Sequence, residues 1–286
     1  MIVAPTSQKY FQMGNDKTIL LAFWLPDVFL LALGSLVLSY LIFVRHDFKN
    51  IVVWFVVGAI SYATLYCVAF AWMTDTGWLG VMAMLSATII SGNFAIGLTP
   101  VFRKLMFRRS KDGKTQWILT KTLTQILVVW TLILVIFPLL IVQIEAKIGI
   151  PHFSIPFQKI FGIVLFPLIS AIGLIAAYSM AKIGRGTPLP MDTTNKLVVS
   201  GIYAYIRNPM AVSGIGQSLL VGFILGSPLV LLYALLGAFI WKFIYQKLEE
   251  DDLLEQFGAD YEEYRKKVKS IIFFITLKLN VKLIIN

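Results

Sequence analysis

Apolar runs separated by short polar connections make up most of the chain. Because an α-helix needs about 20 apolar residues to cross the hydrocarbon core of a bilayer, each long run predicts a transmembrane helix. We place these helices near residues 19–44, 51–73, 77–101, 117–144 and 159–183. Pro26 and Asp27 interrupt the first run, so its crossing is predicted to begin nearer residue 28.

A further apolar stretch, from residue 214 to residue 247, is interrupted at Gly226-Ser227-Pro228. Ser227 suits the N-cap of a helix and Pro228 its first position, so this stretch predicts two antiparallel helices joined by a tight turn. The pattern therefore indicates an all-α fold. We expect a polytopic transmembrane helical bundle of about seven spans, including this C-terminal helix-turn-helix hairpin.

The composition excludes an ordinary soluble domain. Hydrophobic residues make up 58% of the 286 residues and charged residues 14%, with a mean hydropathy of +0.80, whereas about a quarter of the residues in a soluble domain are charged. The net charge of +10 comes from basic residues at the ends of apolar runs, which indicates contacts with anionic lipids and not nucleic-acid binding. The single cysteine, Cys67, and the distant His46 and His152 predict neither a disulfide framework nor a metal site.

The basic residues also predict the orientation in the membrane. The connection from Arg103 to Lys121 is strongly basic and holds one acid, Asp112, and basic connections face the cytoplasm. Counting spans from there places the segment from Arg45 to Lys49, and everything after the fifth span, on the same side. We therefore expect the N-terminus outside, and residues 184–208 and the C-terminus in the cytoplasm.

The chain is expected to have three parts. Residues 1–150 would form an N-terminal transmembrane region of about four spans with no recognisable motif, residues 151–270 a catalytic core, and residues 271–286 an interfacial tail. Within the core, Gly258 followed by Asp260 predicts that one helix stops and a second begins. Tyr261 and Tyr264, at helical spacing in that second helix, are interpreted as packing residues.

Two polar segments interrupt this apolar background. The first is Leu197–Gly214, which reads LVVSGIYAYIRNPMAVSG, and the second is the acidic pair Glu249-Glu250 after the hairpin. An arginine beside a hydrophobic span is costly to bury unless it meets an anion or water. Pro209 biases Asn208 away from helical geometry, which exposes backbone groups there. We interpret the two segments as the halves of one polar site.

A plainer interpretation exists for each segment. Arg207 could be a positive-inside residue at a helix end, and the two glutamates could begin a solvated acidic run. The loop from Gly184 to Pro190 could be a helix C-cap at Gly184 followed by a proline-rigid connection. The functional interpretation depends on finding these segments together in one chain.

Their order and separation resemble those of a known family. The residues concerned are GRGTPLP (184–190), LVVSGIYAYIRNPM (197–210), EEDDL (249–253), FG (257–258) and YEEY (261–264). Residues 160–270 or so thereby resemble the isoprenylcysteine carboxyl methyltransferase and phospholipid N-methyltransferase superfamily, whose members are integral membrane enzymes that use S-adenosylmethionine. In its pattern R-(H/N)-P-x-Y-x-G, this chain has Ala211 in place of Tyr and Ser213 in place of Gly, with Gly214 following.

The resemblance implies a cofactor site. Arg207 and Glu250 are the expected catalytic residues. The expected cofactor-binding residues are Gly186, Thr187, Val199, Gly201, Tyr203, Arg207, Asn208, Pro209, Glu249 and Glu250. The cofactor carboxylate would pair with Arg207, and its ammonium, sulfonium and ribose would face a carboxylate, with Glu250 preferred over Glu249.

The implied reaction is in-line methyl transfer to a lipophilic or amphipathic acceptor (a carboxylate, thiol or amine) at the cytoplasmic face. Asn208 stands where many relatives have histidine, which favours an acceptor that arrives ionised, and the acceptor is expected to come sideways from the bilayer. Two alternatives stay open. A transporter or scaffold would explain the spans but not the Arg-Asn-Pro and Glu-Glu segments, and an NADPH-dependent membrane sterol reductase has a similar fold.

Overall fold

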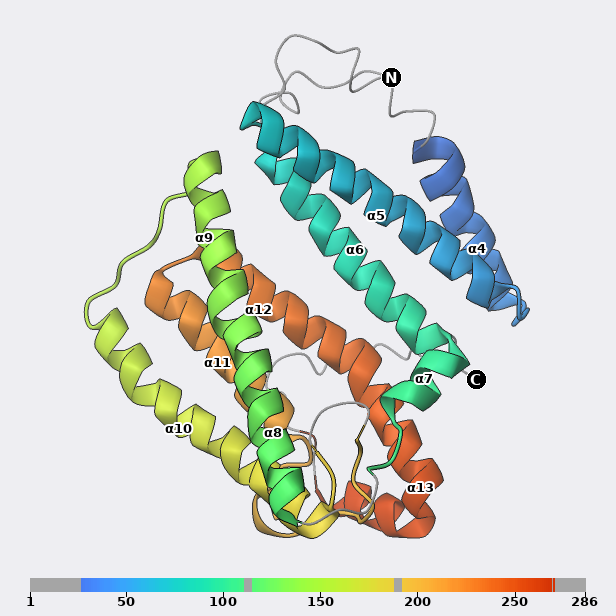
Figure 1. Cartoon of the computed structure of the whole chain (residues 1–286), viewed down its shortest axis with the longest axis vertical. Helices are drawn as coiled ribbons and strands as arrows, with labels where there is room; N and C mark the ends of the chain where they lie inside the picture. The colour runs from blue at the N-terminus through green and yellow to red at the C-terminus, as the bar shows by residue number, and fades with distance from the viewer. Residues whose placement is uncertain (1–26, 111–114, 188–191, 269, 271–286) are drawn as a thin grey trace. The chain divides into compact units, whose positions relative to one another are not determined.

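A computed structural model describes residues 27–110, 115–187, 192–268 and 270 (Figure 1). Their regular structure is helical, apart from one isolated parallel bridge between Arg109 and Thr193. This confirms the predicted all-α class. The predicted beginning of the first span, residues 188–190 of the motif loop and the predicted interfacial tail lie outside the described residues.

The described residues form two compact units. The N-terminal unit holds residues 27–99, and the C-terminal unit holds residues 100–268 and 270. The division falls at Thr99, whereas the sequence placed the end of the N-terminal region at residue 150. The reason is that helices between residues 115 and 148 pack against those between residues 209 and 240.

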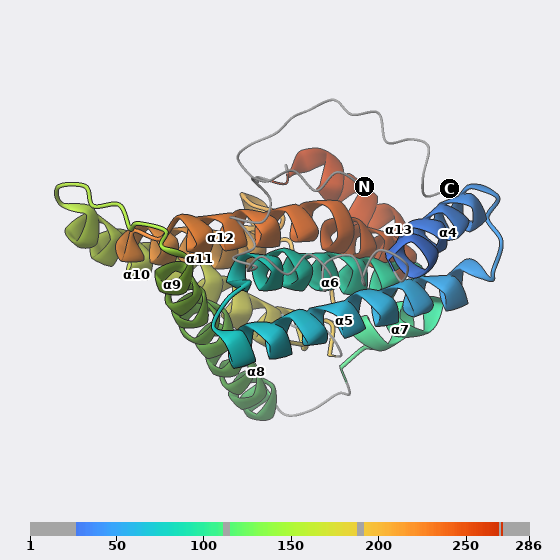
Figure 2. The ribbon, with the colours of Figure 1, turned by 90° about the horizontal axis from the view of Figure 1, so that it is seen from above.

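The described part of the N-terminal unit consists of three neighbouring helical segments. They are η1 (Asp27–Ala32) continued by α4 (Leu33–Phe43), then α5 (Lys49–Thr74) and α6 (Trp78–Leu98), and α5 lies along α6 in both ribbon views (Figures 1 and 2). The hydroxyl groups of Thr64 and Thr88, one from each of these helices, are 2.7 Å apart. Such hydrogen bonds join helices that otherwise present only apolar surfaces.

The C-terminal unit contains all the motif residues that the structure describes. Its helices are α7 (Pro100–Met106), α8 (Thr115–Trp130), η2 (Thr131–Ile136), α9 (Phe137–Ile148), α10 (Gln158–Ser179), η3 (Met180–Gly184), η4 (Gly201–Ala204), α11 (Pro209–Leu225), α12 (Pro228–Ile240), η5 (Trp241–Tyr245) and α13 (Gln246–Lys267). The segment from α8 through η2 to α9 is one continuous rod, α10 packs along α11, and α11 packs along α12 (Figures 1 and 2).

The predicted hairpin is confirmed. Helix α11 ends at Gly226, whose φ of 65° lies in the left-handed region that glycine tolerates. The Ser227 side chain then accepts a hydrogen bond of 3.0 Å from the Val230 backbone N–H, and Pro228 takes the first position of α12. These two residues therefore start α12 as predicted.

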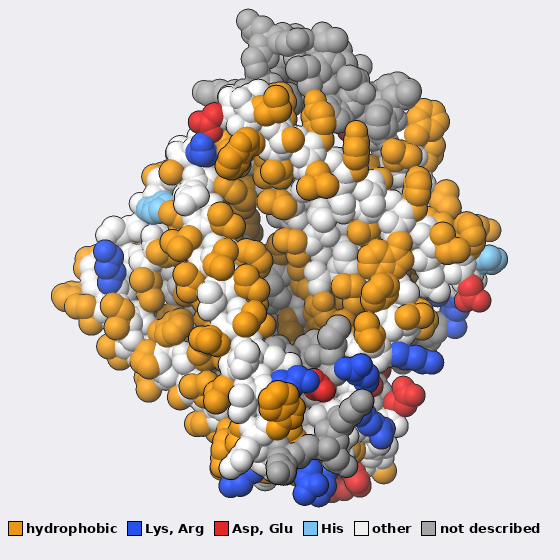
Figure 3. Space-filling model, in the orientation of Figure 1, with side chains coloured by type: hydrophobic (Ala, Val, Ile, Leu, Met, Phe, Trp, Pro, Cys, Tyr) orange, Lys and Arg blue, Asp and Glu red, His pale blue; other side chains and the backbone are white. Residues whose placement is uncertain are grey.

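Five of the described helices are long and apolar enough to cross a membrane. They are Lys49–Thr74, Trp78–Leu98, Thr115–Ile148, Gln158–Gly184 and Pro228–Lys267. Two shorter apolar helices are Asp27–Phe43 and Pro209–Leu225. Trp72 is 80% exposed and Phe43 is 81% exposed, and hydrophobic side chains cover the helices in Figure 3. Apolar surface of this extent faces lipid and not water.

The longest of these helices has two chemically different parts. Its apolar part comprises α12 and η5, whereas more than half of the residues of α13 are charged. Such a density of charge does not enter a bilayer core, so α13 lies outside the membrane-spanning stretch. Figure 3 shows Lys and Arg side chains gathered near this end of the C-terminal unit, where α8 begins and α13 lies.

Two helix ends test the local predictions. At Gly258 the backbone takes φ 51° and ψ −123°, a conformation that glycine adopts at little cost, and α13 kinks there as expected. The other end differs from the expectation. The helix η3 ends at Gly184, but the residue in the left-handed conformation is Arg185, with φ 53°. Gly184 is instead required for close packing, because a Cβ there would lie 2.6 Å from Thr194 Cγ2.

Candidate active site

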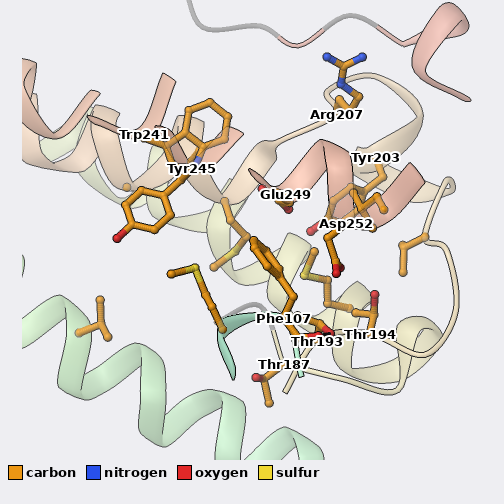
Figure 4. Close-up of a pocket in the computed structure, with 18 of the residues that line it drawn as sticks. Phe107, Thr187, Thr193, Thr194, Tyr203, Arg207, Trp241, Tyr245, Glu249 and Asp252 are labelled. Carbon is orange, nitrogen blue, oxygen red and sulfur yellow. Dashed lines mark hydrogen bonds between the residues drawn. The ribbon is translucent and has the colours of Figure 1, made fainter. Parts of the chain in front are cut away.

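A cavity of about 550 Å³ lies within the C-terminal unit, where α13 meets the motif segments (Figure 4). Its described lining comprises Met106 and Phe107; Ile126, Val129 and Trp130 of α8; Ile133 and Leu134 of η2; Met180 of η3; Thr187, Thr193, Thr194, Leu197, Val198 and Tyr203; Arg207; Met210, Ala211, Gly214 and Gln217 of α11; Trp241 and Tyr245 of η5; and Glu249, Asp252, Leu253, Gln256, Tyr261 and Tyr264 of α13. Three of these elements, η2, η3 and η5, are π-helical turns. Such turns often occur at functional sites.

One wall of the cavity is the loop that follows η3. Gly186 allows this loop to fold tightly, because a Cβ there would lie 2.6 Å from Thr194 Cα. The Thr187 N–H donates to the Asp192 carbonyl at 2.8 Å, and the Gln256 side chain of α13 donates to the Thr194 carbonyl at 3.0 Å. These contacts hold the threonine side chains of the loop, those of Thr187, Thr193 and Thr194, at the cavity.

The same loop is attached to the start of the C-terminal unit. Asp192 forms an ion pair with Lys121 of α8, and the Asn195 side chain donates to the Ser110 carbonyl at 3.0 Å. The N–H of Thr193 donates to the Arg108 carbonyl, also at 3.0 Å. Segments far apart in the sequence therefore form one continuous wall.

Arg207 and Glu250, the expected catalytic residues, contact each other. Arg207 Nη2 donates to Glu250 Oε1 at 2.7 Å, and Nη1 donates to the Arg265 carbonyl at 3.2 Å. The two side chains are 10% and 16% exposed, and Gln246 donates a further hydrogen bond of 2.7 Å to Glu250. Figure 4 shows the Arg207 guanidinium directed away from Thr187, Thr193 and Thr194. Arg207 is thus a lining residue whose charge is already neutralised.

Glu249 lies next to this ion pair and lines the cavity. Burial raises the pKa of Glu249 to about 7, and the carboxylates of Glu250 and Asp252 add to the rise. Arg207 and a side-chain hydrogen bond from Asn208 act in the opposite direction. Glu249 is therefore held close to the point where it is half ionised at neutral pH.

A second carboxyl, that of Asp252, faces the cavity one helical turn after Glu249 (Figure 4). Burial raises the pKa of Asp252 to about 6, with a contribution from Glu255, whereas Arg109 and Arg103 lower it. Residues three positions apart on a helix share a face, so the two carboxyls lie on the same side of α13. Together they make this side of the cavity suited to a cation.

Several buried polar atoms at the cavity have no hydrogen-bond partner among the described residues. They include the hydroxyls of Tyr203 and Tyr261, the Nε of Arg207 and the side-chain oxygen of Gln217. Burial raises the pKa of Tyr203 well above its usual value, with further contributions from Glu249 and Tyr264, so its phenol stays neutral and can donate. Unpartnered buried groups of this kind are costly unless a ligand or water satisfies them.

The predicted cofactor-binding residues divide into three groups. Thr187, Tyr203, Arg207 and Glu249 line the cavity, and Asn208 is buried and lowers the pKa of Glu249. Gly186, Pro209 and Glu250 lie directly behind the lining, where they shape the loop, start α11 and pair with Arg207. Val199 and Gly201 are exposed and do not belong to the described lining, although Gly201, with φ 64°, begins the short helix that buries Tyr203.

Sequence reasoning missed part of the site. Trp241, Tyr245, Leu253 and Gln256 were not predicted; with the predicted Glu249 they follow one another at spacings of three or four along η5 and α13, and this helical stripe could have been found from the sequence. Tyr261 and Tyr264 are buried, as the packing interpretation expected, but they also line the cavity. Phe107, Thr193 and Thr194 have no such signal, because tertiary contacts alone bring them to α13.

Comparison with known proteins gives the family. Residues 157–260 match the family model described as phospholipid methyltransferase. The segment belongs to this methyltransferase superfamily. The resemblance found in the sequence is thereby confirmed for the part of the chain that lines most of the cavity.

Named relatives agree with this assignment. The chain is 41% identical over 80 residues to a protein-S-isoprenylcysteine O-methyltransferase of Schizosaccharomyces pombe, which covers 26% of this chain and 31% of the relative. It is 34% identical over 84 residues to the protein of that name in Xenopus laevis (29% and 28%) and 35% identical over 85 residues to the one in Homo sapiens (29% of each). The chain thus spans less than a third of the length of these relatives.

Proposed function

We propose that this chain transfers a methyl group from S-adenosylmethionine to a lipophilic or amphipathic acceptor at the cytoplasmic face of a membrane. The observation that carries the proposal is the pair of carboxyls, Glu249 and Asp252, that face a cavity of about 550 Å³. Among the described lining residues, Arg207 alone carries a positive charge, and Glu250 neutralises it. A cationic ligand would supply the missing positive charge.

The residues present fit S-adenosylmethionine. A cavity of this volume is in the usual range for such a ligand, about 300 to 1,000 Å³. The two carboxyls suit its ammonium, its sulfonium and its ribose hydroxyls, and the unpartnered Arg207 Nε and Tyr203 hydroxyl suit its carboxylate. Phe107 and Trp241 offer apolar faces to an adenine ring.

The bound cofactor would supply the activated methyl carbon that an acceptor attacks. The chain's own contribution is to bind the two partners, hold them in line and exclude water, which lowers the barrier through orientation and a dry, charge-matched site. The π-helical turns η2 and η5 supply the apolar walls for this purpose. Glu249, close to half ionisation, can also accept a proton from an acceptor that arrives protonated.

The orientation with the site in the cytoplasm rests on charge. The end of the C-terminal unit that holds the cavity carries the basic residues of α7, the segment after it and α13, including Arg103, Arg109 and Arg265. The positive-inside rule places such an end in the cytoplasm. A cofactor made in the cytoplasm would then reach the cavity directly.

The alternatives fit less well. NADPH brings several negative phosphates, which would meet two carboxyls and an arginine that is already paired. A transporter or scaffold would not require a cavity with this many unpartnered buried polar groups beside the family signature.

The test uses the purified full-length chain in lipid nanodiscs. Incubation with methyl-tritiated S-adenosylmethionine and a lipid extract of the host should transfer label to an extractable lipid or amphiphile, and Glu249→Gln should reduce this transfer. Asp251→Asn, which changes an exposed neighbouring acid, is the matched control. Binding of NADPH but not of S-adenosylmethionine by the unmodified chain would refute the proposal.

A further inference from the structure

The wall of the cavity that α8, η2 and α11 form is almost entirely apolar. Ile126, Val129, Trp130, Ile133 and Leu134 supply one side, and α11 supplies Met210, Ala211 and Gly214. Gln217 of α11 is the one described side chain in this wall that carries an oxygen atom. A carboxamide in such surroundings needs an explanation.

Gln217 is fully buried, with 0% exposure, and lies in the middle of α11. Its Nε2 donates to Ser170 Oγ of α10 at 2.7 Å, and its Oε1 has no partner among the described residues. It is eight residues after Pro209, which places it about 12 Å further along the helix axis. The free oxygen is thus well separated from the start of α11, where Asn208 meets Glu249.

The hydrogen bonds determine which end of the Gln217 amide is left free. The Ser170 hydroxyl has one hydrogen to donate. Its Oγ lies 2.7 Å from the Phe166 carbonyl oxygen, which can only accept. Ser170 therefore accepts from Gln217 Nε2, and the amide oxygen is the end of this lining side chain that is left without a partner among the described residues. In the reverse orientation Ser170 would give up its bond to the Phe166 carbonyl in order to donate to the amide oxygen, and the amide NH2 would be left without a partner among the described residues.

An amide oxygen without a partner in a dry helical bundle is expensive. The cost of a buried unsatisfied acceptor is about 1 to 3 kcal/mol in proteins, and a bilayer offers no water to relieve it. A ligand that brings an O–H or N–H to this depth would recover that cost. A plain hydrocarbon chain, such as an isoprenyl chain, would not.

We infer that Gln217 is a specificity-determining residue that accepts a hydrogen bond from the methyl acceptor. The acceptor is accordingly an amphiphile with an O–H or N–H donor on its apolar body, about 12 Å from the polar end of the cavity. Gly214 and Ala211 lie about one and two turns before Gln217 and line the same cavity, and their small size leaves room for that body. This inference rests on the proposed function, since it names the substrate class of the same cavity.

The test compares two isomers, one with a hydrogen-bond donor and one without: decan-1-ol and the ether 1-methoxynonane. Their binding to the full chain in nanodiscs is measured from the increase in melting temperature over a concentration series. One neutral hydrogen bond is worth about 1 kcal/mol, so the unmodified chain should prefer the alcohol about fivefold. Gln217→Met keeps the length and volume but removes the oxygen, and should abolish the preference.

Two further variants separate recognition from packing. Ser213→Ala removes a hydrogen bond of 2.8 Å between the same two helices, to the Ile169 carbonyl, without touching the described lining, and should keep the preference. Gln217→Glu, protonated in this apolar setting, should also keep it, since its hydroxyl can donate to Ser170 and its carbonyl can face the cavity. If Gln217→Met does not fold, Ser170→Ala, which frees the amide to turn, should weaken the preference.

The outcomes are distinct from those for the proposed function. A preference that Gln217→Met retains, or an unmodified chain that binds the two probes alike, would overturn the role of Gln217 whatever the chain does with S-adenosylmethionine. The converse result is an unmodified chain that binds no S-adenosylmethionine while Gln217→Met still loses the preference for the alcohol. That result would refute the proposed methyl transfer and support the role of Gln217 as a hydrogen-bond acceptor for a ligand.

Discussion

Replacing Glu249 by glutamine should change how cofactor binding depends on pH. Burial and the neighbouring carboxylates raise the pKa of Glu249 to about 7 in the chain without ligand. A cation that requires the ionised carboxyl must therefore compete with a proton. At pH 7 the carboxyl is about half ionised and at pH 5 only about 1%, so affinity should fall about fiftyfold over this range, about 2.3 kcal/mol.

Asp252 adds a smaller dependence of the same sign. Its pKa of about 6 implies a fall in its ionised fraction of about tenfold between pH 7 and pH 5. Glu249→Gln should therefore bind more weakly at pH 7 and keep only this tenfold dependence. The ligand does not confuse the comparison, because an α-amino group, with a pKa near 8, stays charged throughout the range.

Isothermal titration calorimetry of S-adenosylmethionine at pH 7, 6 and 5 measures both quantities. At pH 7 the unmodified chain should also release about half a proton on binding, which appears as a heat that varies with the ionisation enthalpy of the buffer. Asp251→Asn, an exposed acid two residues after Glu249, is the control and should behave like the unmodified chain. Affinity that is independent of pH, or a fiftyfold dependence that survives in Glu249→Gln, would refute the reasoning.

Three further perturbations test other parts of the interpretation. Arg207→Ala leaves Glu250, which is 16% exposed, without its partner, so it should lower the free energy of unfolding by about 3 kcal/mol and weaken S-adenosylmethionine binding at least tenfold. Adding Glu250→Gln to this variant should lower the free energy of unfolding little further. If urea unfolding shows that the losses of the two single variants add, the pair is not coupled. Ala211→Tyr should place a ring in the cavity next to the apolar wall and reduce the range of acceptors that the chain methylates. An unchanged KM for every acceptor would contradict this. Single-cysteine variants at Ser110 and Ser154 should be labelled from opposite sides of the membrane, the first from the cytoplasm, and equal labelling of both from the cytoplasm would overturn the orientation.

Local sequence signals predicted most of the fold. The apolar runs located the helices because a bilayer crossing requires length and hydrophobicity, both of which are local properties. Ser227 and Pro228 started α12, and Gly258 kinked α13, because each residue type suits one backbone geometry. The helix end near Gly184 was misassigned because Arg185 takes the left-handed conformation there, while Gly184 is needed to let the chain pass Thr194 closely.

The site was predicted in part. Its motif segments were expected together, and Thr187, Tyr203, Arg207 and Glu249 do line one cavity. The preference for Glu250 over Glu249 as the group facing the cofactor had no structural basis in the sequence. Adjacent helical residues point about 100° apart, and only the packing of α13 decided which one faced the cavity.

The sequence by itself determined the class of fold, the hairpin, the breaks in the helices and the superfamily, because these depend on residue types at short separations. The tertiary structure decided that Arg207 is neutralised by Glu250, that Glu249 and Asp252 face the cavity, and that the amide oxygen of Gln217 is left without a partner among the described residues. Charge state and hydrogen bonding depend on which groups are buried together. Residues more than forty positions apart, such as Gln217 and Ser170, meet only when the helices pack.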